Sequence, residues 1–436
     1  MLIGKRTFFF LPAFLCAVAA RGVPGALALE SLPEPLVADA GIEGSFGTPG
    51  GIAPPGSGTL RWTQVTSTAP WVWSFSSALA FDGRLWVVLG NGQVWRSPDG
   101  ADWTLVTAAP GWPSRAAFPT LEFNGQMWLF GGLDNRNDVW SSSDGEIWTQ
   151  TIEHAAWPGR IFHKALFFDG RAWVLGGVDW DGITFNDVWS SSDGANWVEA
   201  TGDAPWVGRE SHAACVFNGR MWISGGWSTD YGIVMGDTWS SVDGTNWTYE
   251  GGGAGHRLGP EMVVYDDRMW ILGGWYGGDA TNRVWSSTDG RAWTESLPTP
   301  PWASGVCEAA LVFNDKLWVL GGYTHGGDDV SEVWYAELSP YHSVDQDEDN
   351  RISVSELLRA IQFFNSGGYH CADGTEDGYA PGPGGQTGCA VYSCDYKSGA
   401  DWEISLSELL RVVQFYNGGG YHVCAEGEDG FCVGVS

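Results

Sequence analysis

The chain has 436 residues and a formal net charge of −30 at pH 7. This excess of acidic residues excludes nucleic acids and anionic membrane surfaces as partners, because both carry the same sign of charge. The 63 glycines and 28 tryptophans far exceed ordinary usage and indicate a β-rich protein with many tight turns and aromatic wedges.

Residues 1–28 are typical of a secretory signal peptide. Two basic residues precede an apolar run from Phe8 to Ala20, and Ala26-Leu27-Ala28 offers a cleavage site. The run is too short to cross a bilayer comfortably, and Arg21 follows it at once, which favours cleavage over the alternative of an uncleaved anchor. We therefore expect a protein that is secreted or held at the cell surface, with no membrane span after cleavage. Residues 29–58, with their Gly, Pro and Ser, predict a flexible linker.

A unit of roughly 45 to 50 residues repeats through residues 59–341, a period typical of radial β-propellers. In each copy a tight turn is followed by a predicted strand that contains a Trp and ends at a Gly or a Gly pair. A later predicted strand begins with a second Trp. The first Trp of each copy is Trp86, Trp128, Trp173, Trp222, Trp270 or Trp318. Four short strands in each of six copies predict an all-β, six-bladed propeller.

The last copy lacks the Trp that closes the others, because position 342 is His342. A matching strand, Leu60 to Val65 with Trp62, stands alone before the first copy. We therefore predict that the N-terminal strand completes the sixth blade. This exchange would lock the ring and leave no long unpaired edge.

The Gly pairs and the Trp that opens the outer strand resemble propellers of the kelch and galactose-oxidase type, over about residues 60–341. The resemblance implies the fold, and rings of this type include enzymes, scaffolds and binding modules. The run from Ser141 to Thr149, SSSDGEIWT, is also similar to the Asp-box turn of sialidase-type propellers. Gly145 follows Asp144 directly, however, so we interpret this run as a hairpin turn.

Strand parity predicts which face of the ring carries a site. In an antiparallel blade the connections between second and third strands emerge beside the loops that join the blades, and the other connections are tight turns. Those longer connections carry aromatic rings able to stack on sugars, while arginines, two histidines and a glutamate recur in register near the innermost strands. The predicted ligand-binding residues are Arg115, Arg160, Arg209, Arg257, His163, His212, Glu308, Trp180, Trp227, Trp275, Tyr276 and Tyr323. Together these residues predict a binding site for a polar or anionic glycan. The alternative for the arginines and histidines is a structural role that duplication of the blade has repeated.

Residues 342–436 follow a different pattern, which predicts a small α-helical calcium-binding domain. Oxygen-bearing side chains stand at positions 1, 3, 5, 9 and 12 of a twelve-residue loop, as in an EF-hand, and position 7 offers its backbone carbonyl. The predicted ligands are Asp345, Asp347, Asp349, Arg351, Ser353 and Glu356. A second copy supplies Asp395, Asp401 and Glu408, but its loop is longer and contains Lys397, so we expect a weaker or lost second site.

The paired loop and helix units, with ISVSELLR repeated as ISLSELLR, are similar to dockerins over about residues 341–417. This resemblance implies a calcium-dependent module that docks onto a cohesin-like scaffold. The five cysteines of this region are odd in number, and their pairing stays open.

Two functions remain. The first is a secreted, non-catalytic recognition protein whose propeller binds a carbohydrate or an extracellular protein and whose calcium-stabilised tail docks it. The alternative is a secreted glycosidase or lyase acting on a polysaccharide, with Glu308 or His212 as acid or base. Convergence of two carboxylates, or of Glu308 with His163 and His212, would favour the enzyme.

Overall fold

The computed structural model describes residues 60–71, 77–276, 279–296, 300–302, 306–323, 329–338, 352–367, 369–371, 379–382, 404–423 and 431–433. The expected signal peptide and linker lie outside these residues. So do most of the predicted calcium ligands, namely Asp345, Asp347, Asp349, Arg351, Asp395 and Asp401.

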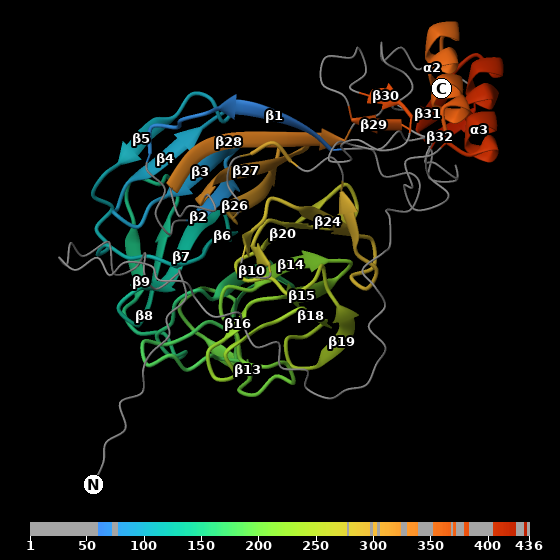
Figure 1. Ribbon diagram of the computed structural model, residues 1–436. Coiled ribbons are helices and arrows are strands. Elements are labelled where there is room, and N and C mark those ends of the chain that lie inside the picture. The colour runs from blue at the N-terminus through green and yellow to red at the C-terminus, as the bar shows by residue number, and fades with distance from the viewer. Residues whose placement is uncertain are drawn as a thin grey trace, which may run out of the picture.

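Six four-stranded antiparallel sheets form a ring, and the prediction of a six-bladed propeller is confirmed (Figure 1). From the innermost strand outward, the first blade is β2 (Ser77–Phe81), β3 (Arg84–Val88), β4 (Val94–Ser97) and β5 (Thr104–Thr107), and the second is β6 (Thr120–Phe123), β7 (Gln126–Gly132), β8 (Arg136–Ser142) and β9 (Thr149–Ile152). The third blade is β10 (Lys164–Phe168), β11 (Arg171–Leu175), β12 (Val188–Ser191) and β13 (Val198–Thr201), and the fourth is β14 (Ala213–Phe217), β15 (Arg220–Ser224), β18 (Asp237–Ser241) and β19 (Trp247–Gly252). The fifth blade is β20 (Glu261–Tyr265), β21 (Arg268–Leu272), β24 (Val284–Ser287) and β25 (Thr294–Ser296), and the sixth is β26 (Val306–Phe313), β27 (Lys316–Tyr323), β28 (Asp329–Leu338) and β1 (Leu60–Thr66). We number the blades 1 to 6 in this order.

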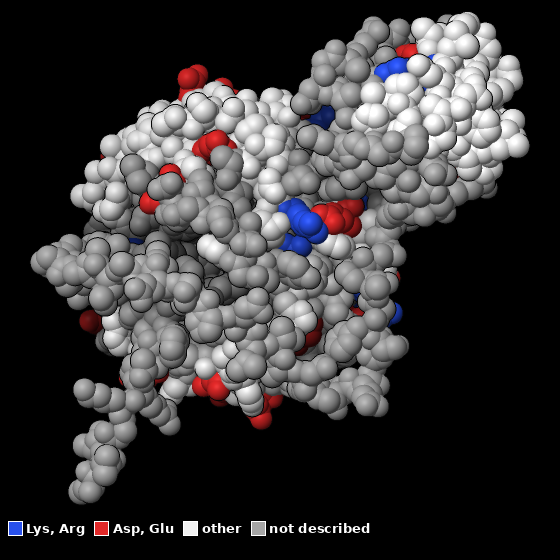
Figure 2. Space-filling view, in the orientation of Figure 1, with Lys and Arg blue, Asp and Glu red and all other residues white. Residues whose placement is uncertain are grey.

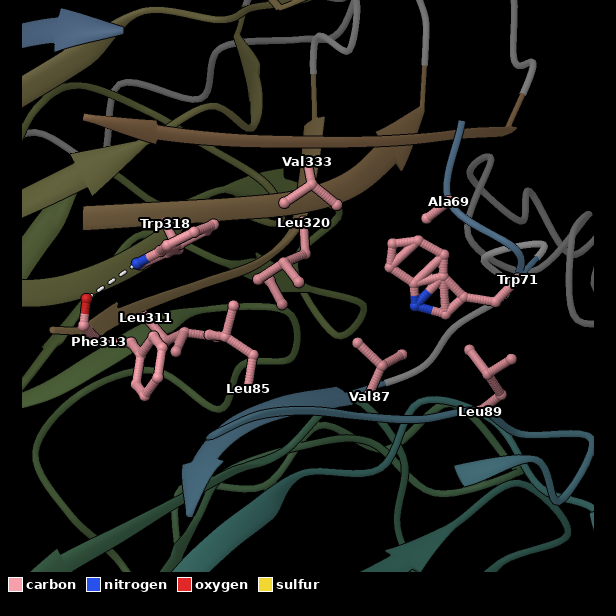
Figure 3. Packing of buried hydrophobic residues seen from close by; sticks show 11 residues of the cluster. Ala69, Trp71, Leu85, Val87, Leu89, Leu311, Phe313, Trp318, Leu320 and Val333 are labelled. Carbon is pink, nitrogen blue, oxygen red and sulfur yellow. Dashed lines mark hydrogen bonds between the residues drawn. The ribbon is translucent and has the colours of Figure 1, made fainter. Parts of the chain in front are cut away.

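The N-terminal strand closes the ring as predicted. Figure 1 shows β1, in blue, beside β28, in orange, and the two pair antiparallel with Gln64 opposite Trp334. Trp62 meets Trp302 edge to face, with ring centroids 4.4 Å apart. At the seam between blades 6 and 1, Leu85 and Val87 pack with residues of the last blade, as Figure 3 shows. Both chain ends of the ring therefore contribute to one continuous core.

The recurring Trp and turn Gly residues form locks between neighbouring blades. The Trp of each second strand donates its Nε1–H to a backbone carbonyl five residues earlier, as Trp318 does to Phe313 in Figure 3. Its ring edge lies over the turn Gly of the next blade, where a Cβ atom would overlap it. The described pairs are Trp318 with Gly100, Trp86 with Gly145, Trp128 with Gly194, Trp173 with Gly244, and Trp222 with Gly290.

The Ser-x-Asp-Gly runs are hairpin turns, as interpreted from the sequence. In blade 3 the Asp193 carboxylate accepts hydrogen bonds from the backbone N–H groups of Ala195 and Asn196. The bond from Asn196 is the largest of the effects that lower the pKa of Asp193 to about 2. The Asp193 carboxylate therefore has a structural role, in which it stabilises the turn.

The C-terminal region contains two helices, α2 (Val354–Asn365) and α3 (Leu406–Asn417), which pack together around Phe363 and Phe415. A short hairpin follows each helix: β29 (Tyr369–Cys371) with β30 (Tyr379–Pro381), and β31 (Tyr421–Val423) with β32 (Phe431–Val433). The internal duplication seen in the sequence is therefore a structural duplication. Neither of these helices is long and apolar enough to cross a membrane.

Candidate functional site: the loop face of the ring

The connections between second and third strands build raised hairpins on one face of the ring, which we call the loop face. In blade 4 this connection contains β16 (Trp227–Ser228) and β17 (Ile233–Val234), and in blade 5 it contains β22 (Trp275–Tyr276) and β23 (Asp279–Ala280). In blade 3, Val178 forms a β-bridge with Thr184. Backbone pairing within each connection holds it in a defined shape, so side chains at the hairpin tips are presented on a rigid support.

Exposed apolar and aromatic side chains gather at the tips in blades 3 and 4. Trp180 is 48% exposed, Ile183 is 53% exposed and Tyr231 is 70% exposed. We call these three residues the aromatic ridge. Exposed rings are costly to keep in water, so their grouping on one surface makes the aromatic ridge the candidate contact area of the loop face.

The two hairpins that carry the aromatic ridge are joined to each other and to blade 2. Thr184 Oγ1 donates to Asp230 Oδ2 at 3.0 Å, which links blade 3 to blade 4. The backbone N–H of Trp180 donates to Asn135 Oδ1 at 3.3 Å, which links blade 3 to blade 2. Within the blade 3 hairpin, Asp179 Oδ1 accepts from the N–H of Ile183 at 2.8 Å. The loop face of these blades is therefore one connected surface.

The other loop aromatics predicted to bind ligand occupy different environments. Trp227 and Trp275 are only partly exposed, and each pairs through its backbone with the strand-entry segment of its own blade, at Glu210 and Leu258 respectively. The side chains of Tyr276, Tyr323 and Glu308 lie outside the described residues. Of the predicted set, Trp180 is thus the described ring with the largest exposed surface.

The four predicted arginines are buried, and their contacts correct the expectation of an exposed anion grip. In blade 4, Arg209 forms two hydrogen bonds with the Asp237 carboxylate at 2.7 and 2.8 Å and donates to the Gly225 carbonyl at 3.0 Å. The same arrangement joins Arg115 to Asp138 and Arg160 to Asp187. A paired, buried guanidinium cannot also hold an external anion, so these contacts fit the structural alternative.

Blade 5 departs from this pattern. Arg257 donates to the carbonyls of Ala254 and Gly273, each at 2.9 Å, but Arg283 stands where blades 2, 3 and 4 have the aspartate. The aspartate elsewhere also accepts from the outer-strand Trp, as Asp237 does from Trp239 at 2.6 Å. Trp285 Nε1 is buried without a hydrogen-bond partner among the described residues, which is the cost of this substitution.

His163 and His212 are also enclosed, at 3% and 0% exposed. A Cβ on Gly131 would lie 3.3 Å from the His163 ring, and a Cβ on Gly176 would lie 2.9 Å from the His212 ring. Each imidazole therefore packs against the Gly pair of the preceding blade, which explains why glycine recurs there. Burial lowers the pKa of both rings well below the ordinary value, so they are neutral at pH 7, and no described group bonds their nitrogens.

The entrance to the central channel is bridged on the loop face. Lys164 and Glu261 begin the innermost strands of blades 3 and 5, and the Lys164 Nζ lies 2.6 Å from Glu261 Oε1. Because blade 4 stands between them, this ion pair reaches across the channel. A ligand approaching this face therefore meets the loops before it meets the channel.

One carboxyl on this face is unusual. Burial is the largest effect on Glu210 and raises its pKa to about 7, although a hydrogen bond from Thr229 acts in the opposite direction. Unlike an ordinary carboxyl, Glu210 thus takes up a proton near neutral pH. Glu210 lies beside the blade 4 hairpin, because its backbone pairs with Trp227.

Sequence reasoning missed a group of polar residues around the tip of blade 2. A pocket of about 450 Å³ is lined there by residues that include Asp134, Arg136, Glu153 and His154. The sequence feature that could have indicated this pocket is the short connection between the second and third strands of blade 2. Only the three residues from Leu133 to Asn135 separate β7 from β8, whereas β11 and β12 are separated by residues 176–187.

The described part of residues 342–436 contains the end of each loop that the sequence predicts to bind calcium. Glu356 and Glu408 are buried, and each carboxylate accepts from a serine N–H three residues earlier, at 2.7 Å in both copies. Ile352 and Ile404, at the apolar loop position, are both in the core between the helices. Among the described residues no group of three or more His, Cys, Asp or Glu side chains is placed to hold a metal.

The surface charge agrees with the acidic composition. In the view of Figure 2, acidic side chains are spread singly over the ring and few basic side chains reach the surface. Nothing in that view forms the continuous basic area that an anionic polymer would need.

Comparison with known proteins supports the fold alone. No protein-family model matches the chain, and no curated protein matches it. Among solved structures, the chain is similar to the one described as the structure of YjhT, with a TM-score of 0.53 and 16% sequence identity, over 62% of this chain and 96% of that one. The chain is a six-bladed β-propeller with a duplicated pair of helices after the ring.

Proposed function

We propose that this protein is an exported, non-catalytic recognition protein with a kelch-like ring that binds carbohydrate through its loop face. The observation that carries the proposal is the aromatic ridge, where Trp180 and Tyr231 stand exposed on hairpins that are bonded to one another. Flat rings on rigid loops lose little conformational entropy when they stack on a sugar. The ion pair between Lys164 and Glu261 spans the entrance of the channel beside these loops.

The enzymatic alternative has less support. His163 and His212 are too deeply enclosed to reach an external glycan. Glu210 has a pKa near that of a general acid, but glycoside hydrolysis requires a second carboxylate at a defined separation. Glu308, predicted as an acid or base, has a side chain outside the described residues.

The recognition proposal predicts a selective loss of glycan capture. The full chain should bind a subset of polysaccharides on a glycan array, and Trp180→Ala and Tyr231→Ala should each weaken capture about tenfold, which corresponds to ~1.4 kcal/mol. Tyr249→Ala is the matched control, since this ring is exposed on the outermost strand of blade 4 rather than on a loop. Equal binding by all four proteins, or no binding by the wild type, would rule the proposal out.

The tail completes the proposal as a calcium-stabilised docking module. The residues that would hold calcium are Asp345, Asp347, Asp349, Ser353 and Glu356, with Arg351 through its carbonyl. Two observations support the fit: Glu356 is held in a buried position at the start of α2, and Ile352 anchors the end of the loop in the core. Bound calcium would fix the loop and supply the charge that balances its carboxylates. A cohesin-like scaffold is the partner class that this module implies.

Calcium should raise the melting temperature of the C-terminal transition in the full chain, by an amount that grows with calcium concentration as binding to the folded state requires. Glu356→Gln should remove the calcium-dependent shift. Glu408→Gln is a matched control, because the two residues cap their helices with the same hydrogen bonds at 2.7 and 3.3 Å. Because the second calcium site is expected to be weaker or lost, Glu408→Gln should lower the melting temperature without calcium by the same amount as Glu356→Gln and should keep most of the calcium-dependent shift. A wild-type chain without any shift would exclude calcium.

A further inference from the structure

The hollow at the tip of blade 2 adjoins the aromatic ridge. Its pocket of about 450 Å³ falls in the size range of small-molecule sites. The hollow exists because the blade 2 connection is a tight turn, in which Asp134 and Asn135 take left-handed backbone angles with φ of 69° and 56°. The neighbouring blade 3 connection rises as a hairpin beside it. Asn135 belongs to the pocket and also accepts from the N–H of Trp180, so pocket and ridge are continuous.

The pocket combines an apolar side with hydrogen-bonding groups. Pro113, which is exposed, and Trp140, which is 9% exposed, belong to its lining. Arg136 supplies donors through its Nη groups, since the Nη nearest Asp134 is 3.6 Å from that carboxylate, too far for a hydrogen bond. Its Nε is buried and has no hydrogen-bond partner among the described residues. Glu153 supplies acceptors. An apolar surface beside hydrogen-bond donors and acceptors matches the apolar faces and the hydroxyl groups of a sugar.

The orientation of His154 can be assigned from its neighbour. Asn137 Nδ2 donates to the carbonyls of Ala155 and Trp157, at 3.0 and 3.1 Å, so its Oδ1 must be the atom that meets His154 Nδ1 at 3.1 Å. Nδ1 is therefore the donor, and Nε2 of the neutral ring is left as an acceptor. The pocket lining thus has a second fixed acceptor besides the carboxylates.

The charges of the lining select against acidic sugars. Asp138 is neutralised by Arg115, which leaves Arg136 to face the carboxylates of Asp134 and Glu153. One cation against two anions gives a net negative pocket, in a chain with a net charge of −30. A uronic acid would meet repulsion here, whereas a neutral hexose would not.

We infer that the blade 2 pocket is a subsite for one neutral hexose unit at the end of a glycan chain, and that Trp180 stacks on the adjoining unit. This inference rests on the proposed carbohydrate recognition and names its substrate class. It replaces the sequence-based expectation of an anionic glycan, because the arginines behind that expectation are paired inside the blades.

Saturation-transfer NMR on the full chain tests the subsite with glucose, galactose and mannose against glucuronic and galacturonic acids. At least one neutral hexose should give transfer, the uronic acids should give none, and Arg136→Ala should reduce the signal at least fivefold. Arg84→Ala is the matched control, since Arg84 also lies 3.6 Å from an aspartate, Asp82, but at a turn on the opposite face. Gln150→Trp, at an exposed strand position in the lining, should block the pocket while Arg136 stays in place.

The outcomes separate the two proposals. If glycan capture falls in Trp180→Ala but is unchanged in Arg136→Ala and Gln150→Trp, the subsite is wrong and recognition by the ridge stands. Stronger transfer from the uronic acids than from the neutral hexoses would overturn the assigned charge selectivity. If the wild type neither captures glycans nor gives transfer from any sugar, both proposals fail. Circular dichroism and melting curves of each variant should match the wild type, since the four substituted positions, Arg84, Arg136, Gln150 and Trp180, are outside the buried core.

Discussion

Replacing Gly194 by alanine should lower the free energy of unfolding of the ring by about 3 kcal/mol, made of ~1–2 kcal/mol for a left-handed non-glycine residue and ~1–3 kcal/mol for overpacking. Gly194 has a φ of 76°, and a Cβ there would overlap the ring of Trp128 from the preceding blade. The added methyl group must displace a buried Trp that two blades share. Chemical denaturation followed by tryptophan fluorescence measures the loss.

Gly170→Ala is the control for the backbone term in the same blade. Gly170 has a φ of 69°, and a Cβ there would meet nothing within 4 Å. We expect this variant to lose only the ~1–2 kcal/mol of the left-handed conformation. A second check combines Gly194→Ala with Trp128→Phe, whose smaller ring removes the overlap, so the double variant should be less destabilised than the sum of the single ones. Equal losses for Gly170→Ala and Gly194→Ala would show that the Trp–Gly contact is not a lock.

Replacing Arg209 by methionine should cost about 3 kcal/mol, because it leaves the Asp237 carboxylate, whose side chain is 22% exposed, without its partner. Arg209 is buried, and it makes two hydrogen bonds to that carboxylate and one to the Gly225 carbonyl. In a domain of this size the expected fall in melting temperature is roughly 10 °C. Arg209→Met combined with Asp237→Leu should recover most of the loss, since the unpaired charge is then gone as well.

The pH dependence of this loss tests its electrostatic origin. Burial by itself would raise the pKa of Asp237, but the hydrogen bond and charge of Arg209 outweigh it and the net pKa is lowered. A carboxyl with a lowered folded-state pKa stabilises the fold above its unfolded value, about 3.9, and loses that contribution as the pH falls. The difference between wild type and Arg209→Met should therefore be largest near pH 7 and shrink below about pH 4. A difference that stays constant from pH 7 to pH 3 would assign the effect to packing.

The architecture could be predicted because each blade repeats its own local rules. The Trp spacing, the turn residues and the displaced strand around Trp62 predicted six blades and strand exchange, and both are confirmed. The conformation of a hairpin turn depends on residues that are close in the sequence. The structural role of Asp193 and its counterparts in these turns could therefore be predicted as well. The signal peptide, the linker and the calcium loop stay predictions, since they lie outside the described residues.

The candidate site could be predicted from the sequence only in part. The loop face and the exposed ring of Trp180 followed from strand parity and loop length. The roles of the arginines did not, because each partner lies far along the chain, with Asp138 23 residues from Arg115 and Asp237 28 residues from Arg209. A sequence shows that both residue types recur, but it does not show that they face each other.

The sequence by itself determined the number of blades, the closure of the ring and the face that carries the long loops, because these depend on period, turn type and parity. Only the tertiary structure decided which Trp meets which Gly, which charges are neutralised inside a blade, and which polar groups line a pocket. These outcomes depend on contacts between blades and between distant strands. Such contacts are set by the direction and burial of side chains, which the spacing of residues in the sequence does not show.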